Sequence, residues 1–307
     1  MIHVKKCLFA LLIGISISGC KEQVSSQSTS IKPYETDTFK TYWYAGKAEL
    51  SSYSLEQSRY GELREGKAVL IFVTEDFSQK KLVKLDQPDN AGKDKVSVLK
   101  MNFTKNFVTG IYPYSMMLSV FTPVLRSQFP NSLKGTMSSQ EWCGQVFNQL
   151  TLKGNKYNVS AFSYFENEGD ENLTLENAIL EDELWNLIRL EPENLPIGEF
   201  KMIPGLFFTR LNHTDLKVMV ANGAISENIS DLLYTVSIED HERILAIRFE
   251  KSFPHKILGW EESFTERSKA TRTKAVLDKT LITDYWTKNK NEFSYLRDSL
   301  NLSRKNY

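Results

Sequence analysis

Three cysteines supply the thiols through which this chain could do covalent chemistry, and the second of them ends a distinctive segment. Residues 1–6 include Lys5 and Lys6, residues 7–18 are almost entirely apolar, and Gly19 precedes Cys20. A basic start, a short apolar run and a small residue before the cleavage point are typical of a secretory signal peptide. The apolar run has about twelve residues, whereas a membrane-spanning helix needs roughly twenty. We therefore predict a signal peptide over residues 1–19.

The four residues at this cleavage point, Ile17, Ser18, Gly19 and Cys20, resemble the lipobox of bacterial lipoproteins. The resemblance implies a thioether between the Cys20 sulfur and a diacylglyceryl group, and an acyl chain such as palmitate on the new amino terminus. Two such chains hold a protein stably on a membrane, because each buried CH2 contributes about 0.8 kcal/mol. Lys21 in place of aspartate implies the outer membrane, with the domain in the periplasm or at the cell surface. The alternative is an ordinary secretory signal with a chance cysteine.

Cys143 is the thiol that remains once Cys7 is removed and Cys20 is lipidated, so no internal disulfide is expected. It lies in residues 141–147, an apolar stretch typical of a strand, and we predict a buried, unreactive thiol. The alternative is an envelope hydrolase that uses Cys143 or a pair of carboxylates. A nucleophilic cysteine would need a neighbouring base and an electropositive environment. The sequence has no Gly-x-Ser-x-Gly elbow and no glycine-rich phosphate loop.

Metal ions, cofactors and nucleic acid are not predicted as partners. Beyond the signal segment the histidines are His213, His241 and His255, and their spacing is not that of a zinc site. Residues 166–172 are rich in oxygen ligands but lack the order of an EF-hand loop. Without residues 1–19 the chain has 36 basic and 38 acidic residues. A nucleic-acid-binding domain would instead show a clear basic excess.

Aromatic residues form the candidate binding groove. They are Tyr42, Trp43 and Tyr44, then Tyr112 and Tyr114 on either side of Pro113, and Trp142. Exposed together, they would suit a glycan, a peptide or an apolar ligand. Because aromatic side chains more often belong to the core, the alternative is that they pack inside the domain.

The chain divides into the signal peptide, a tether and one domain. Residues 20–38 are rich in Ser, Gln, Thr and Lys, which predicts a flexible tether. Residues 39–307 form the domain, in which apolar residues recur with the period of two that indicates strands. The predicted strands cover residues 53–56, 68–73, 96–103, 116–124, 138–151, 157–165, 199–211, 217–221, 233–239, 243–251, 256–265 and 271–282.

Two helices are predicted among these strands. The first begins at Asn172 or Thr174 and continues through Leu184, Trp185 and Ile188, which recur at helical spacing. The second is a terminal helix over residues 284–302. The fold class is mostly β (α+β): a large curved antiparallel sheet or half-barrel, with the inserted helix across its open side. A closed barrel or a sandwich would also satisfy the pattern, since so wide a twisted sheet must curl or split.

Four stretches resemble an uncharacterised bacterial lipoprotein family that is often labelled "septum formation inhibitor Maf". They are residues 42–49, 59–62, 109–115 and 140–144. The true Maf proteins are α/β nucleotide pyrophosphatases with a Ser-x-Ser-Pro-Arg-Arg loop, and this chain lacks that loop. The resemblance therefore implies an exported lipoprotein and transfers no catalytic residue.

The sequence as a whole predicts a lipid-anchored protein of the cell envelope. The anchor, the tether, the strand pattern and the missing catalytic motifs favour a non-enzymatic binding or scaffold module. Its partners would be the membrane, through the lipid, and an apolar ligand or an envelope protein. We expect that ligand or protein on the concave face of the sheet.

Overall fold

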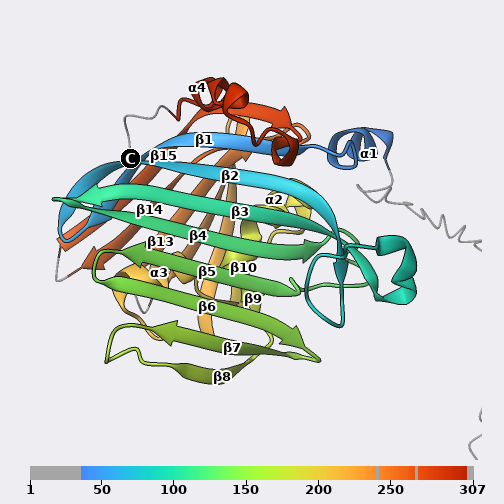
Figure 1. Ribbon diagram of the computed structural model, residues 1–307. Helices are drawn as coiled ribbons and strands as arrows, with labels where there is room; N and C mark the ends of the chain where they lie inside the picture. Colours follow the sequence, from blue (N-terminus) through green and yellow to red (C-terminus); the bar gives the residue numbers. More distant parts are fainter. Residues whose placement is uncertain (1–35, 240–241, 267–268, 303–307) are drawn as a thin grey trace, which may run out of the picture. The chain divides into compact units, whose positions relative to one another are not determined.

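The computed structural model describes residues 36–239, 242–266 and 269–302. Within these ranges fifteen strands form one sheet, in the order β8-β7-β6-β5-β4-β3-β2-β1-β15-β14-β13-β12-β11-β10-β9 (Figure 1). Neighbouring strands are antiparallel except for β9 and β10, which are parallel. The chain therefore builds the sheet as two meanders that meet where β1 pairs with β15.

The first meander is consecutive along the chain. Its strands are β1 (Ala48–Arg59), β2 (Glu62–Ser78), β3 (Lys95–Thr109), β4 (Tyr112–Pro123), β5 (Lys134–Glu141), β6 (Gly144–Lys153), β7 (Lys156–Ser163) and β8 (Glu171–Glu176). The remaining strands are β9 (Ile179–Leu180), β10 (Gly198–Ile203), β11 (Met219–Glu227), β12 (Asp231–Ile238), β13 (Arg243–Glu250), β14 (Ile257–Glu266) and β15 (Lys269–Thr283).

The helices are short and lie between strands or at the ends of the domain. The α-helices are α1 (Asp37–Trp43), α2 (Leu184–Leu190), α3 (Leu206–Asn212) and α4 (Tyr295–Ser299). The 3-10 helices are η2 (Pro88–Asn90), η3 (Gly92–Asp94), η4 (Glu181–Glu183), η5 (Pro192–Asn194), η7 (Tyr285–Thr287) and η8 (Asn291–Phe293).

Tight turns fix the register of the first meander. Residues 60–61 connect β1 to β2, and both have positive φ, +56° at Tyr60 and +76° at Gly61. Positive φ at both central residues is the requirement of a type I′ turn, whose twist matches that of the flanking strands. In the β3–β4 and β6–β7 turns, Gly110 and Gly154 each have φ of +60° at the first central position, where a type II′ turn needs glycine. These glycines allow long strands to reverse within two residues.

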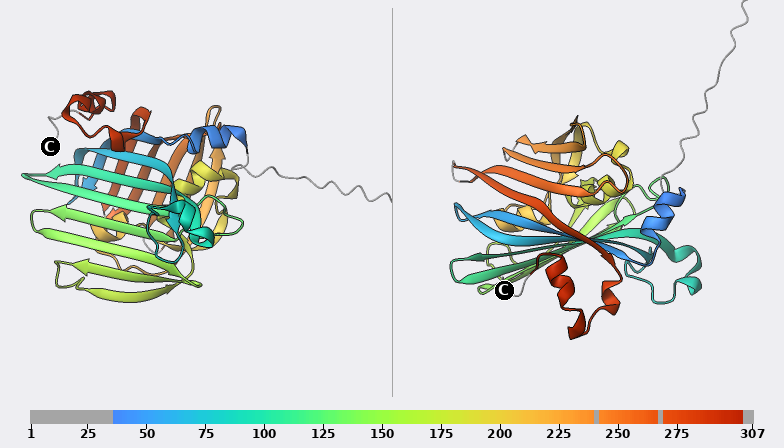
Figure 2. Two further views of the ribbon diagram at one scale, coloured as in Figure 1. Left: turned by 45° about the vertical axis from the view of Figure 1, so that its right-hand side comes forward. Right: turned by 90° about the horizontal axis from the view of Figure 1, so that it is seen from above.

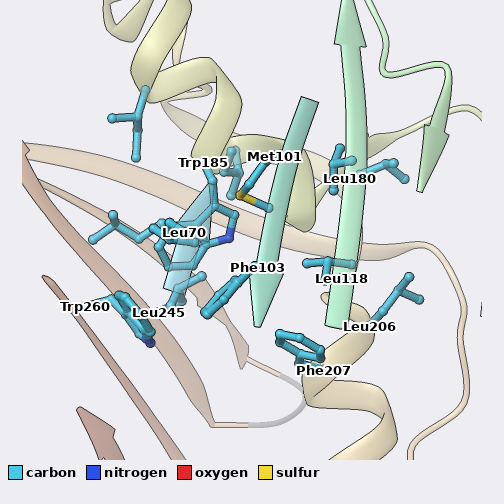
Figure 3. Close-up of a cluster of buried hydrophobic side chains, with 14 of the residues drawn as sticks. Leu70, Met101, Phe103, Leu118, Leu180, Trp185, Leu206, Phe207, Leu245 and Trp260 are labelled. Atoms are coloured by element: carbon cyan, nitrogen blue, oxygen red, sulfur yellow. The ribbon is translucent and has the colours of Figure 1, made fainter. Parts of the chain in front are cut away.

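The main core lies between the concave face of the sheet and helices α2 and α3. Every residue of α2 is buried, and so are residues 206–211 of α3. Figure 3 shows Trp185 of α2 and Phe207 of α3 beside Phe103 and Trp260 of the sheet. The ring of Phe103 lies 5.1–5.3 Å from the other three rings. Edge-on aromatic pairs of this kind each add about 0.5–1.5 kcal/mol beyond the area they bury.

The C-terminal segment covers part of the opposite face of the sheet (Figure 2). Leu300 and Leu302 pack with Ala48, Leu50 and Val69 in a second, smaller cluster. Strands β1 and β2 are consequently buried on both faces along part of their length. This explains why residues 68–73 form a continuous apolar run and not an alternating one.

The predicted fold class is confirmed in its main statement, since the domain is mostly β with a large curved antiparallel sheet. The helix predicted from Asn172 or Thr174 is wrong in its first half. Residues 171–176 form β8, in which Leu173 and Leu175 pack against the core while Thr174 faces outward. This alternation is that of a strand, and β8 forms its backbone hydrogen bonds with β7. Helix α2 begins only at Leu184.

Other predicted boundaries also change. Residues 138–151 are two strands, β5 and β6, and residues 199–211 are β10 followed by α3. The predicted terminal helix is broken into η7, η8 and α4. The tether was predicted to extend to residue 38, but α1 begins at Asp37, where the Thr36 hydroxyl accepts a hydrogen bond of 3.1 Å from the Phe39 amide. Residues 1–35, with Cys20 and the lipobox, lie outside the described residues.

Candidate functional site

Large apolar side chains are exposed where four consecutive hairpins turn. They are Tyr60 and Leu63 at β1–β2, Ile111 at β3–β4, Trp142 at β5–β6 and Tyr164 at β7–β8. Each is 53–79% exposed. In an antiparallel meander these alternate turns must fall at one end of the sheet, which is the left-hand end in Figure 1. We call these five residues the hairpin rim.

A buried arginine fixes the first part of the hairpin rim. Arg59 is 5% exposed and donates to the carbonyl oxygen of Leu211 at the end of α3. Its other terminal nitrogen donates to the hydroxyl of Tyr60 at 3.1 Å and to that of Tyr114 at 3.3 Å. The two hydroxyls are 2.9 Å apart. Because Tyr60 is held before any partner arrives, little side-chain entropy is lost on binding.

The second part of the hairpin rim rests on close aromatic packing. The ring of Tyr112 lies 6.5 Å from that of Trp142. Gly144 gives room to Tyr164, because a Cβ at Gly144 would come within 2.6 Å of that ring. Tyr164 in turn contacts Phe165 at 5.6 Å between ring centroids. The rim is therefore a set of supported side chains.

The hairpin rim is surrounded by negative charge. The turns and the strand ends beside them carry seven acidic residues: Glu62, Glu65, Glu141, Glu166, Glu168, Asp170 and Glu171. Arg64 pairs with Glu62. Glu168 faces Arg210 at 3.3 Å and His213 at 2.6 Å. Burial acts to raise the pKa of Glu168, but hydrogen bonds from Ser163 and His213 and the charge of Arg210 outweigh it, so the pKa is lowered.

A groove of about 970 Å³ continues from the hairpin rim along the outer face of β1–β4 and β15. Val108 and Pro113, which flank the β3–β4 turn, line it together with Val276 and Leu302. Charged side chains stand along it: Glu56, Glu65, Lys67 and Lys274. Rim and groove together offer a mixed apolar and charged surface larger than a small ligand needs.

The structure separates the predicted groove aromatics into two groups. Tyr112, Tyr114 and Trp142 come together at the hairpin rim, although Tyr114 is buried. Tyr42 and Trp43 belong to α1, at the opposite end of the sheet in Figure 1, and so does Tyr44, which follows it. Trp43 is 1% exposed, and Tyr42 donates its hydroxyl to Glu49. Trp43 and Tyr114 thus pack inside the domain, which was the alternative to a binding groove.

Cys143 was predicted to be buried, and this is wrong. The thiol is exposed, because residues 142–143 form the β5–β6 turn and not the middle of a strand. Its backbone amide donates to Glu141 at 2.7 Å, and a hydrogen bond to Glu141 also raises the pKa of the thiol. A raised pKa keeps the sulfur protonated, which is unsuited to a nucleophile.

The ligand or partner protein was expected on the concave face of the sheet, but helices cover that face. Side chains of α2 and α3 occupy it, including Trp185, Ile188 and Phe207. Among the residues that the structure describes, no group of histidine, cysteine and acidic side chains could hold a metal ion. His213 pairs with Glu168, while His241 lies outside the described ranges.

A cluster of buried charges lies beside α3, and no pattern in the sequence predicted it. Arg243 binds Glu181 with both terminal nitrogens and Glu262 at 2.7 Å, while Lys105 and Asp182 lie nearby. Burial and the charge of Glu181 raise the pKa of Asp182 to about 7. Perturbed acids can mark active sites. Here the adjoining cavity, beside Glu262, measures only about 10 Å³, which is at most the size of one water.

No helix among the described residues has the length and hydrophobicity needed to span a membrane. No family model matches the sequence, and no curated protein matches it. Among solved structures, the chain is similar to a β-barrel-like protein with a domain of unknown function from Brucella abortus. The identity is 9% and the TM-score 0.36, over 78% of this chain and 98% of that one. The chain is also similar to a porin-like protein from Bacteroides uniformis. The identity is 9% and the TM-score 0.21, over 77% of this chain and 96% of that one.

Proposed function

We propose that this protein is a lipid-anchored, non-enzymatic binding module of the cell envelope whose hairpin rim docks a partner protein. One observation carries the proposal: five large apolar side chains are exposed on consecutive turns at one end of a rigid sheet. The partner surface that fits them is apolar with basic residues around it. The anchor is Cys20, placed in the outer membrane, and membership of the lipoprotein family that the sequence resembles stays a prediction.

The position of the hairpin rim supports this proposal. Thr36, through which the tether enters the domain, precedes α1 at the end of the sheet opposite the rim (Figure 1). Strand β2 has 17 residues, which corresponds to a length of roughly 56 Å. Anchoring and docking therefore use surfaces far apart on the domain, so that one does not obstruct the other.

The chemistry of the hairpin rim favours a protein over a bilayer. Tyrosine and tryptophan are among the residue types that contribute most at protein interfaces, and the exposed Tyr60, Trp142 and Tyr164 supply them. Five of the seven carboxylates beside the rim form no ion pair among the described residues: Glu65, Glu141, Glu166, Asp170 and Glu171. These five would repel anionic lipid headgroups, whereas they complement a basic rim on a partner. The adjoining groove extends the contact toward the area of about 1,000 Å² or more that specific protein interfaces bury.

The anchor is tested by replacing Cys20. In a two-membrane bacterium given radiolabelled palmitate, we expect the natural chain to take up label and to fractionate with the outer membrane. The Cys20→Ser variant should remain unlabelled and leave the membrane fraction, because an unmodified serine carries no acyl chain. Cys143→Ser serves as the matched control and should behave as the natural chain does. Equal fractionation of all three chains would remove the anchor from the proposal.

Docking is tested by site-specific photo-crosslinking in the same cells. A photoreactive amino acid at position 142 or 111 should give one discrete protein adduct, because both positions lie on the hairpin rim. The same amino acid at position 229 is the control, since Ile229 is fully exposed but lies in the β11–β12 turn. Charge reversal at Glu166 and Glu171 should weaken the adduct at position 142 by about tenfold or more, since close charge pairs at an interface are worth about 1.5 kcal/mol or more.

Two outcomes would contradict docking through the hairpin rim. One is an adduct of equal yield from position 229, which would show that crosslinking follows exposure alone. The other is an adduct with lipid in place of protein at positions 142 and 111, which would make the rim a membrane contact. The Cys20→Ser result is independent of both, so failure of the anchor and failure of the rim can be told apart.

A further inference from the structure

A second hollow lies at the opposite end of the sheet from the hairpin rim. It measures about 470 Å³ and is formed by the outer face of β5–β8 and the loop after β2. This volume is in the range of small-molecule sites, but such sites are usually mostly apolar. Here ten of the thirteen lining residues are polar: Lys80, Lys81, Lys134, Gln149, Thr151, Lys153, Asn158, Ser160, Asn172 and Thr174. We call this hollow the lysine pocket.

The floor of the lysine pocket is two rows of polar side chains in register across the strands. One row is Lys134, Thr151, Asn158 and Thr174, which are direct partners from β5 to β8. The neighbouring row is Gln149, Ser160 and Asn172. Residues two apart in a strand share a face, so both rows point outward together. Hydrogen bonds fix the floor, for example from the Ser160 hydroxyl to Asn172 at 2.8 Å.

The wall of the lysine pocket is the loop over residues 79–82. Leu82 is 7% exposed and anchors this loop in a small apolar cluster with Phe77 and Val96. The ammonium group of Lys134 donates to the Leu82 carbonyl oxygen at 3.2 Å, which ties the wall to the floor. The pocket therefore keeps its form without a ligand.

Four ammonium groups surround the lysine pocket, from Lys80, Lys81, Lys134 and Lys153, and its lining has no acidic side chain. Within the described part of the chain none of the four lysines forms an ion pair. The carboxylate of Asp94 accepts hydrogen bonds from the Ser78 hydroxyl at 2.7 Å and the Lys80 amide at 2.8 Å. These bonds, and to a smaller extent the charges of Lys80 and Lys81, lower the pKa of Asp94. Gathered like charges repel one another, and burial lowers the pKa of Lys134.

We propose that the lysine pocket binds an anionic saccharide, that is, a sugar carrying carboxylate or phosphate groups. The lysines supply the charge that an anion needs. The amide and hydroxyl side chains of the floor both donate and accept hydrogen bonds, as sugar hydroxyls require. A bare anion would use donors alone, and a nucleic acid would want aromatic platforms, of which the lining has none. This inference does not depend on the hairpin rim.

Calorimetry on the full-length protein in detergent micelles tests the proposal. Trigalacturonate should bind, while neutral maltotriose and inorganic phosphate should bind at least tenfold more weakly. Lys134→Gln and Lys153→Gln should each lower the affinity for trigalacturonate about tenfold, the effect expected for a charge-assisted hydrogen bond. Lys217→Gln is the matched control, because it removes one exposed lysine outside the pocket. Ser160→Ala should weaken trigalacturonate and leave phosphate unchanged.

A second arm separates a free saccharide from a lipid headgroup. Phosphatidylcholine vesicles that contain a phosphorylated disaccharide glycolipid are compared with vesicles that contain phosphatidylglycerol at equal charge. Binding to the glycolipid alone, lost in Lys134→Gln, would identify the saccharide as a lipid headgroup, and binding of trigalacturonate alone would identify a free saccharide. In the unaltered protein, bound trigalacturonate or glycolipid should also protect Lys134 and Lys153 from acylation. This measurement uses no variant, so it does not depend on how the variants fold.

Several results would overturn the lysine pocket as a saccharide site. One is that neither trigalacturonate nor the phosphorylated glycolipid binds. Another is that phosphate or maltotriose binds with the same affinity as trigalacturonate. Equal loss from Lys217→Gln and Lys134→Gln would indicate nonspecific attraction to exposed lysines anywhere on the surface. Equal binding to phosphatidylglycerol vesicles, or acylation of Lys134 and Lys153 at an unchanged rate with the probe present, would lead to the same conclusion.

Discussion

Replacing Arg189 by methionine is expected to lower the free energy of unfolding by about 3–5 kcal/mol, the cost of leaving one charge of a buried pair without its partner. Arg189 and Glu49 are 0% and 1% exposed at their side chains. The two terminal nitrogens of Arg189 each donate to one carboxylate oxygen of Glu49 at 2.6 Å. Methionine removes both bonds and strands the carboxylate in the core.

The location of this ion pair explains the size of the effect. Arg189 lies in α2 and Glu49 in β1, 140 residues apart. The Arg189 Nε also donates to the Pro254 carbonyl oxygen at 2.9 Å, and the guanidinium lies 4.8 Å from the ring of Phe72. Burial acts to raise the pKa of Glu49, but the charge and hydrogen bonds of Arg189 outweigh it and lower the pKa. One side chain thus joins elements from three parts of the chain.

Urea unfolding followed by tryptophan fluorescence measures this prediction. The midpoint should fall while the slope with urea concentration stays unchanged, as for a loss of stability alone. The double variant Glu49→Gln with Arg189→Met should recover part of the loss, since no charge is then buried. Lys201→Met breaks the exposed pair with Glu176 and should cost less than about 1 kcal/mol. If Arg189→Met lowers the free energy of unfolding by no more than Lys201→Met does, the buried ion pair does not stabilise the fold as argued.

Sequence patterns predicted the parts of this fold that depend on local alternation. Most strands of the sheet were predicted from their period of two, although β8 and β9 were not. Helix α2 was predicted because Leu184, Trp185 and Ile188 recur at helical spacing. Helix α3 was missed because Leu206, Phe207 and Phe208 are consecutive and all buried, so its first turn shows no amphipathic period. Its apolar run is then indistinguishable from a buried strand.

The hairpin rim could be predicted in part. Tyr112 and Trp142 were recognised as candidate binding residues, and turns between successive antiparallel strands must alternate between the two ends of a sheet. The missing step was that residues 142–143 are a turn, which also explains the error over Cys143. The lysine pocket could not be found in this way, because its two rows depend on the register of four strands. The same holds for Glu49 and Arg189, whose pairing is long-range.

Asp182 gives the second large effect, on the pH dependence of stability. It is 7% exposed, and one carboxylate oxygen accepts a hydrogen bond of 3.0 Å from the Leu206 amide. Burial, with the nearby charge of Glu181, raises the pKa of Asp182 from 3.8 to about 7, against the opposing charges of Arg243 and Lys105. Between about pH 4 and pH 7 the folded state therefore holds a proton that the unfolded chain has released.

The direction in which stability changes with pH follows from this difference in bound protons. Stability falls with pH wherever the folded state binds more protons than the unfolded state. The contribution of Asp182 is fully present below about pH 4 and is lost as the pH rises through about 7. At about 1.4 kcal/mol per unit of pKa, the total loss is on the order of 4 kcal/mol. Above pH 7 the fold thus carries a buried carboxylate that is charged.

Asp182→Asn isolates this contribution, because asparagine keeps an oxygen that can accept from the Leu206 amide but does not titrate. The free energy of unfolding of the variant, minus that of the natural protein, should rise between pH 4 and pH 8 by about the same 4 kcal/mol. Urea unfolding at each pH measures it, and subtraction cancels the acids with lowered pKa, such as Glu49 and Glu262. Asp89→Asn, at an exposed position in η2, should give a flat difference. A flat or falling difference for Asp182→Asn would show that Asp182 is charged in the folded state throughout this range, and the buried cluster would then have to accommodate that charge through Lys105 and Arg243.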